Sequence, residues 1–268
     1  MQSNPMIRIR AVKRSGHPTK NDCTPPKPLT RIPVSPVILQ MKTTLVFSTL
    51  FIFGAIQHIF AEVLFDGKNL DHFEFAKGSW EIEKDGSVVC RMQEQKDAKG
   101  KIRIRGMGYL WTKREFADFE LSLAYKLSPG ANSGVFYRSD RDNPVQGGFE
   151  VQLMDNDGFQ KKAKKKLPPR KLNGSFYDGA APAKDFSKPV GEWNAFRLLC
   201  DGARISCYLN GGKCFSVNLE DWNVPGKNPD GSANKFKNAL NDLPRKGRIG
   251  FQNHGQVVWF KDIVIRSF

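Results

Sequence analysis

The feature that most constrains the fold is a strict alternation between Phe119 and Leu127. Large apolar side chains occupy every second position there: Phe119, Leu121, Leu123, Tyr125 and Leu127. Because successive side chains of a strand point to opposite faces of a sheet, this pattern predicts a strand with one buried face. In a helix the apolar residues would instead recur every three to four positions.

Shorter stretches of the same kind recur along the chain, separated by turn dipeptides. Residues 80–83 and 88–92 flank an Asp-Gly pair and predict a hairpin. Residues 191–217 predict three strands joined by further Asp-Gly and Asn-Gly turns, and residues 247–268 predict two more. Strands do not alternate with helices, and no repeat is present. We therefore expect an all-β domain, a two-sheet antiparallel β-sandwich of the jelly-roll type.

Two segments depart from this pattern. Residues 94–106 are rich in charge and are expected to form a loop. Residues 235–243 carry apolar side chains at helical spacing and stop before Pro244, which predicts the one short helix of the domain.

The first 61 residues do not fit the strand pattern at all. Residues 1–40 combine basic residues with prolines and are expected to be disordered or not translated. Residues 41–61 carry Lys42, an apolar run and then a small residue at Ala61, which together predict a secretory signal peptide. The folded domain is then 62–268, and we expect a secreted or periplasmic protein.

A membrane anchor is the alternative interpretation of residues 41–61. Gln57 and His58 interrupt the apolar run, which is short for a spanning helix of about 20 apolar residues. We therefore expect no stable membrane insertion once the signal is removed.

The formal net charge of +15 is concentrated in two places. One is the N-terminal 42 residues, and the other is a single run that comprises Lys161, Lys162, Lys164, Lys165, Lys166, Arg170 and Lys171. A nucleic-acid-binding domain spreads its basic residues over a face built from several elements. We therefore expect no nucleic-acid partner; attraction of an anionic substrate by the lysine run is a minor alternative.

Four cysteines lie in the predicted domain: Cys90, Cys200, Cys207 and Cys214. An Asn210-Gly211 turn would place Cys207 opposite Cys214, at a hydrogen-bonded pair whose Cα atoms are widely spaced. Buried free thiols are therefore favoured over a disulfide. No Cys or His spacing is typical of zinc, and we expect neither a metal nor a cofactor.

The most informative stretch runs from residue 132 to residue 157 and predicts two strands. In the second strand Glu150 and Gln152 share one face, and apolar residues occupy the other. Arg138, on the first strand, is expected to pair with Glu150 and keep its carboxylate ionised. A carboxylate, an amide and a guanidinium are more chemistry than a solvated face needs, so we place the functional site here.

Other polar residues are weaker candidates. His254 would share a face with Gln252, although a lone histidine is more often a packed or capping residue. Asp155 begins an Asp-Asn-Asp-Gly segment, which is typical of a turn and less so of a calcium site. Tyr177, in a loop bounded by glycines, is suited to the rim of a site. The strand of Glu150 supplies no second carboxylate on the same face, which weakens an ordinary two-carboxylate glycosidase.

Eight segments taken together resemble the 3-keto-disaccharide hydrolase domain family, in which they occur in the same order. They are LFDGKNLDHF, GYLWTKREFADFEL, NSGVFYR, FEVQLMDND, GSFYDGAAP, GEWNAFRL, YLNG and IGFQNHGQVVWFKDIVIR. The resemblance covers nearly all of residues 63–268. It implies a concanavalin A-like jelly roll, exported by a bacterium, that acts on oligosaccharides or other glycosides oxidised to a 3-ketone.

The resemblance also implies which residues form the site. The family's recurring polar positions fall on Asn132, Arg138, Glu150, Gln152, Asp155, Tyr177, Gln252 and His254. A 3-ketone acidifies the proton on C2, so one base could expel the C1 substituent and water could add afterwards. We expect Glu150 or His254 to be that base. Arg138, Gln152 or Tyr177 would hold the enolate and the hydroxyls, Asn132 and Gln252 would bind substrate, and Asp155 would be a structural or site acid.

Two alternatives from other functional classes are open. The same fold hosts lectins as well as enzymes, so a non-catalytic carbohydrate-binding jelly roll fits the pattern. An exported β-glycosidase of unoxidised glycans is the other. Asn253 stands where the family commonly has an acidic residue, which leaves the substrate preference open.

Overall fold

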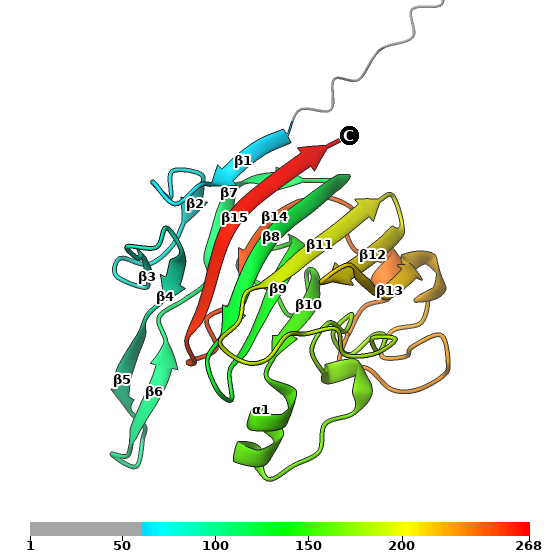
Figure 1. The fold of residues 1–268 in the computed structure, drawn as a ribbon. Coiled ribbons are helices and arrows are strands. Elements are labelled where there is room, and N and C mark those ends of the chain that lie inside the picture. Colours follow the sequence, from blue (N-terminus) through cyan, green and yellow to red (C-terminus); the bar gives the residue numbers. More distant parts are fainter. Residues whose placement is uncertain (1–60) are drawn as a thin grey trace, which may run out of the picture. The chain divides into compact units, whose positions relative to one another are not determined.

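The computed structural model describes residues 61–268, which form a sandwich of two antiparallel sheets with one α-helix (Figure 1). This confirms the predicted fold class. The predictions for residues 1–40 and 41–61 lie outside the described residues, except that Ala61 begins the first strand. In residues 61–268 no helix has the length and apolar character needed to cross a membrane.

The larger sheet has eight strands in the order β13-β12-β11-β8-β15-β4-β3, and β1 pairs with β15 beside this path. Its strands are β1 (Ala61–Phe65), β3 (Trp80–Ile82), β4 (Val88–Cys90), β8 (Phe119–Leu127), β11 (Asn194–Asp201), β12 (Arg204–Leu209), β13 (Gly212–Asn218) and β15 (Val258–Ser267). The predicted hairpin at residues 80–92 and the predicted three-strand meander are both present.

The smaller sheet has five strands in the order β10-β9-β14-β7-β2. They are β2 (Phe73–Glu74), β7 (Leu110–Phe116), β9 (Asn132–Ser139), β10 (Phe149–Met154) and β14 (Gly247–Phe251). Three short 3-10 turns lie in the connections: η1 (Pro169–Lys171), η2 (Leu219–Asp221) and η3 (Leu240–Asp242).

The core fills the space between the two sheets. The alternation predicted for residues 119–127 is realised in β8, whose odd-numbered side chains are buried in the main apolar cluster. Val135 of β9 and Val151 of β10 enter the same cluster from the smaller sheet. Their neighbours Phe136 and Glu150 point the other way, because side chains alternate along a strand. The outer face of the smaller sheet therefore carries the polar residues.

The predicted loop at residues 94–106 is wrong, because this segment forms a two-stranded hairpin. Its strands are β5 (Met92–Lys96) and β6 (Ile102–Gly106), and Figure 1 shows them extending away from the two sheets. Asp97 closes the turn by accepting the N–H groups of Lys99 and Lys101. Ile102 and Ile104 alternate with arginines in β6, but most of the hairpin is exposed on both faces, so the alternation marks no buried face.

The helix prediction for residues 235–243 is also wrong. The N–H groups of Leu240 and Asn241 both bond to Trp222 O, so a tertiary contact uses groups that a helix would need. Only η3 forms there.

The α-helix lies instead in the lysine-rich segment, as α1 (Asn156–Ala163). It has no buried residue, and it therefore shows no apolar periodicity in the sequence. Asp155 caps its N-terminus by accepting a hydrogen bond from the N–H of Gly158.

The predicted register around two cysteines is wrong as well. Asn210 and Gly211 do form the two-residue turn, with φ of 49° and 82°. A bulge in the β12–β13 ladder then pairs Cys207 with Phe215, so Cys207 and Cys214 are not directly opposite. The four cysteines of the described domain are buried free thiols.

Candidate active site

A row of paired residues crosses the outer face of the five-stranded sheet. Glu150 of β10 lies beside Phe136 of β9, and Phe136 lies beside Gly250 of β14. Trp111 of β7 follows Gly250, and Glu74 of β2 ends the row. Because neighbouring strands are about 4.8 Å apart, the row spans roughly 19 Å. The row therefore places the Glu150 carboxylate, at one edge of the sheet, next to the aromatic side chains of Phe136 and Trp111.

Amide side chains line this row on one side. Gln152 Nε2 donates to Asn132 Oδ1 at 2.7 Å, and Gln252 Nε2 donates to the hydroxyl of Tyr109 at 3.1 Å. The Tyr109 ring stacks on Phe136 with 5.5 Å between ring centroids. Three of the predicted substrate-binding residues thus share one surface with the strand that carries Glu150.

Two glycines give the large side chains of the row their space. A methyl group on Gly134 would overlap Glu150 Oε1, and one on Gly250 would overlap the Trp111 ring. The Asn-Ser-Gly and Ile-Gly-Phe segments therefore have a local physical reason for glycine. Any larger residue at 134 would displace the carboxylate.

The segment 173–180 covers the free edge of β10 and brings Tyr177 to the site. The N–H of Gln152 donates to Ser175 O, and the N–H of Tyr177 donates to Glu150 O. Phe176 pairs with Val151 and enters the core, so Tyr177 faces outward on the side of Glu150. Burial and the nearby negative charge of Glu150 raise the pKa of Tyr177, which keeps its hydroxyl protonated at neutral pH.

Glu150 is the most unusual group on this face. It is 7 % exposed, and its carboxylate accepts no hydrogen bond from the described residues. Its cationic neighbour is Lys235, whose Nζ is 3.9 Å from Oε2. Desolvation raises the pKa of Glu150 to about 7, against a smaller opposing effect of the Lys235 charge. A carboxylate with this pKa can accept and release a proton near neutral pH.

The predicted ion pair between Arg138 and Glu150 is wrong. Arg138 has a φ of 45° and lies at a bulge where β9 has one more residue than β14. The bulge turns its side chain away from Glu150. The guanidinium is fully buried and bonds to Asp118 Oδ1 at 2.7 Å, Ala117 O at 2.7 Å and Gly202 O at 2.6 Å. Arg138 joins the ends of the two sheets and has no contact with the row.

Asp155 lies outside the row as well. Besides capping α1, its carboxylate accepts the N–H of Gly130 at 2.6 Å, so both oxygens hold backbone groups. This arrangement is a structural cap, and the described residues contain no group of three or more metal-ligating side chains.

His254 is an exposed residue in the loop after β14, next to the buried Gln252 and Asn253. The side chain of His254 bonds to Gln256, and Gln256 Oε1 accepts the N–H of Asn132 at 3.3 Å. His254 is therefore linked to the row only through Gln256. Desolvation lowers the pKa of His254, and the positive charge of Arg105 adds to this. Its neighbour Asn253 donates to Arg91 O at 2.7 Å, so the residue that departs from the family pattern supports the loop.

Three residues of the site, Tyr109, Trp111 and Lys235, are not among the predicted site residues. Tyr109 and Trp111 line a hollow of about 510 Å³ that continues the row toward Glu74. Tyr109 immediately precedes β7, whose side chains do not alternate between buried and exposed, so no local pattern marked its outward face. Lys235 has no such signal, because the helical spacing of its segment predicted a helix and the observed conformation depends on a contact with the distant Asp178.

The comparisons with known proteins agree with one another. Residues 61–266 match the family model described as 3-keto-alpha-glucoside-1,2-lyase-like domain. A protein of Bacteroides thetaiotaomicron named 3-keto-disaccharide hydrolase is 27% identical over 231 residues, which cover 76% of this chain and 77% of the relative.

Solved structures agree with this match. A Parabacteroides distasonis protein classed as a glycosyl hydrolase is 32% identical with a TM-score of 0.67, and the match covers 78% of this chain and all of that one. A second from the same organism is 25% identical with a TM-score of 0.63, over 78% of this chain and 94% of that one. The chain belongs to the 3-keto-alpha-glucoside-1,2-lyase-like domain family, as its sequence motifs predicted.

Proposed function

We propose that the domain cleaves the glycosidic bond of 3-keto-glycosides by elimination followed by hydration, with Glu150 as the base. The observation that carries this proposal is the Glu150 carboxylate, which is desolvated, accepts no hydrogen bond in the described chain and lies among amide and aromatic groups. Membership of a 1,2-lyase-like family and the name of the Bacteroides relative support the same substrate class.

The proposed chemistry begins with the ketone of the substrate. Glu150 takes the C2 proton, and the electron pair of the C2–H bond moves into the C3 carbonyl to form an enolate. The pair then returns to form a C1=C2 double bond as the C1–O bond breaks, and the leaving oxygen takes up a proton. Water adds to C1 and C2 regains a proton, so the net change is hydrolysis.

A mechanism with two matched carboxylates is less suited to this site. Asp178 is the acidic residue next to Tyr177, and its oxygens are occupied by Arg170, Lys171 and the N–H of Lys235. A general acid or nucleophile needs a free oxygen directed at the glycosidic bond. Elimination next to a ketone requires only one free carboxylate, and Glu150 provides it.

The test compares two disaccharides that differ only at C3. The purified domain should release the leaving-group sugar from the 3-keto-disaccharide and leave the unoxidised disaccharide intact, as followed by mass spectrometry. Release from the unoxidised compound would instead show an ordinary glycosidase. Binding of the keto-disaccharide without turnover would show a carbohydrate-binding module.

The pH dependence of activity should report the ionisation of Glu150. The groups that face this carboxylate are Lys235, Tyr109 and Tyr177, and burial dominates its pKa of about 7. Because a base must be ionised, kcat/KM on a 3-keto-glycoside should rise with pH and level off above about 7. A profile that is flat between pH 5 and 8 would exclude Glu150 as the base.

Ionisation of Glu150, which should raise activity, should lower the stability of the fold. The pKa of Glu150 rises from its ordinary value of 4.5 to about 7 on folding, so the folded state holds this proton more tightly. The free energy of unfolding should therefore fall by about 3 kcal/mol as the pH rises from about 4.5 to about 7. In Glu150→Gln this part of the pH–stability curve should be flatter.

A further inference from the structure

Lys235 carries an ammonium group that has no hydrogen-bond partner among the described residues, and it lies beside a carboxylate that has none there either. Its Nζ donates no hydrogen bond to any described residue and lies 3.9 Å from Glu150 Oε2. The same atom is 4.1 Å from the centre of the Tyr177 ring. The side chain is 24 % exposed, so it is mostly withdrawn from solvent but open on one side. Both charged groups are therefore free to bind a third molecule.

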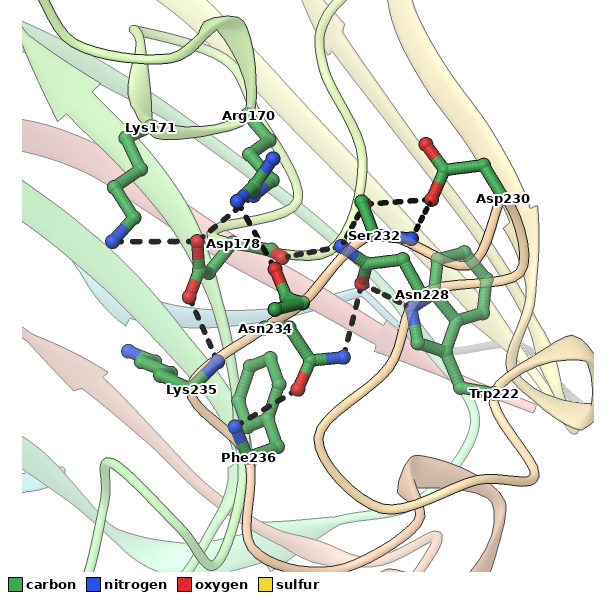
Figure 2. A network of polar contacts seen from close by, with 11 residues as sticks. Arg170, Lys171, Asp178, Trp222, Asn228, Asp230, Ser232, Asn234, Lys235 and Phe236 are labelled. Atoms are coloured by element: carbon green, nitrogen blue, oxygen red, sulfur yellow. Dashed lines mark hydrogen bonds and ion pairs between the residues drawn. The ribbon is translucent and has the colours of Figure 1, made fainter.

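The backbone that carries Lys235 is fixed on both sides (Figure 2). Asp178 Oδ2 accepts the N–H of Lys235 at 2.9 Å, and Asn234 Oδ1 accepts the N–H of Phe236 at 2.9 Å. Phe236 is buried in the core. These bonds fix where the Lys235 side chain begins, next to Glu150.

A second layer of contacts fixes Asp178 and Asn234 themselves (Figure 2). Asp178 Oδ1 binds Arg170 Nε at 3.1 Å and Lys171 Nζ at 3.3 Å. Asn228 Oδ1 accepts from Asn234 Nδ2 at 3.0 Å, and its Nδ2 donates to Asp178 O at 3.2 Å. One buried network therefore ties the loop of Lys235 to the segment that carries Tyr177.

We propose that Lys235 is the electrophilic residue of the site, donating a hydrogen bond from its ammonium group to the C3 oxygen of the keto-sugar. This inference rests on the proposed function. C2 and C3 are bonded to each other, so the base that removes the C2 proton and the donor that binds the C3 oxygen must lie a few ångströms apart. The Lys235–Glu150 separation meets this requirement.

The role is electrostatic, and the proton count is simple. As the C2 proton passes to Glu150, the electron pair of the C2–H bond becomes the C2=C3 bond and the C3 oxygen becomes negative. The Lys235 ammonium keeps its proton and stabilises that charge through its hydrogen bond. This hydrogen bond is strong because the Lys235 ammonium group is already fixed in place and partly desolvated before the substrate arrives.

Lys235→Met tests the proposal, because methionine keeps most of the length of the side chain and removes its charge. Loss of one preorganised donor to an oxyanion lowers kcat by about 100- to 1,000-fold, and that is the expected loss here, with KM changed much less. Lys235→Arg should recover part of the activity. Lys237→Met, two positions along and exposed, should match the wild type.

Two further readouts separate this role from a structural one. Solvent exchange of the C2 proton should slow in Lys235→Met in proportion to kcat. The rise of the pH profile should move to higher pH, because Lys235 no longer lowers the pKa of Glu150. Melting temperatures should show that the variant is folded.

Several results would overturn the proposal. Lys235→Met with kcat within a few-fold of the wild type would remove Lys235 from the chemistry. If borohydride trapped a covalent adduct of Lys235 with the substrate, Lys235 would act by forming a Schiff base and not by donating a hydrogen bond. If the wild type itself cleaves no 3-keto-glycoside, the proposed function fails and the role of Lys235 falls with it. If the wild type is active and Lys235→Met is equally active, only the role of Lys235 is contradicted and the proposed function stands.

Discussion

Glu150→Gln should lower kcat on a 3-keto-disaccharide by about 10³-fold or more while the domain stays folded. Glutamine has nearly the same shape but cannot accept the C2 proton, and general base catalysis contributes about 10²- to 10⁴-fold. The melting temperature at pH 8 should be equal to or above that of the wild type. The wild type must hold an ionised carboxylate there without a hydrogen bond, which costs stability.

A matched control comes from Glu94, which is exposed on the β5–β6 hairpin. Glu94→Gln should leave both kcat and the melting temperature unchanged. If Glu150→Gln retained full activity, Glu150 would be a substrate-binding or structural residue, and His254 would become the candidate base. If it unfolded, the carboxylate would have a structural role that its lack of hydrogen bonds does not suggest.

Arg138→Met should be the most destabilising single change among the predicted site residues. The substitution leaves the carbonyls of Ala117 and Gly202 without their donor and removes the partner of Asp118. Breaking such a buried set costs about 3 kcal/mol or more. For a domain of this size the melting temperature should fall by about 10 °C.

The activity of the folded fraction separates a structural Arg138 from a catalytic one. At a temperature where Arg138→Met is still folded, its kcat should lie within about threefold of the wild type. Arg103→Met is the control, since Arg103 is exposed on the β5–β6 hairpin and paired with Asp97, and an exposed pair contributes under about 1 kcal/mol. A 100-fold loss of kcat in folded Arg138→Met would show that Arg138 contributes to catalysis and would contradict a purely structural role.

The parts of the fold that were predictable are those with local patterns. Strand β8 begins and ends where the alternation does, because a period of two needs no information from the rest of the chain. Glu150 was recognisable for the same reason. The residues on the opposite face of its strand are all apolar, so the face that carries Glu150 and Gln152 stands out. The site face on β10 could thus be predicted from six residues.

The errors arise where a distant partner decides the conformation. The bulge at Arg138 depends on the register with β14, more than 100 residues later, and it reverses the side to which the side chain points. Lys235 reaches the site because Asp178 holds its backbone across 57 positions. Neither relation leaves a trace in the local sequence.

The error at residues 155–163 has a different origin. Asp-Asn-Asp-Gly suits both a turn and a helix N-cap, because the same side-chain oxygen can accept the N–H groups of either. Helix α1 buries no residue, so no apolar stripe was available to separate the two. The segment was therefore predicted to form a turn.

Proton abstraction from C2 can be followed with deuterium at that carbon. A C2-deuterated 3-keto-disaccharide would be cleaved in ordinary water and the released keto-sugar examined by mass spectrometry. Exchange in the unreacted substrate and in a Glu150→Gln reaction gives the background. The cleaved keto-sugar should have lost most of its deuterium, because elimination removes it and hydration supplies a solvent proton. Retention of the label in most of the cleaved product would show that the C1–O bond breaks without loss of the C2 proton, and would contradict the proposed role of Glu150.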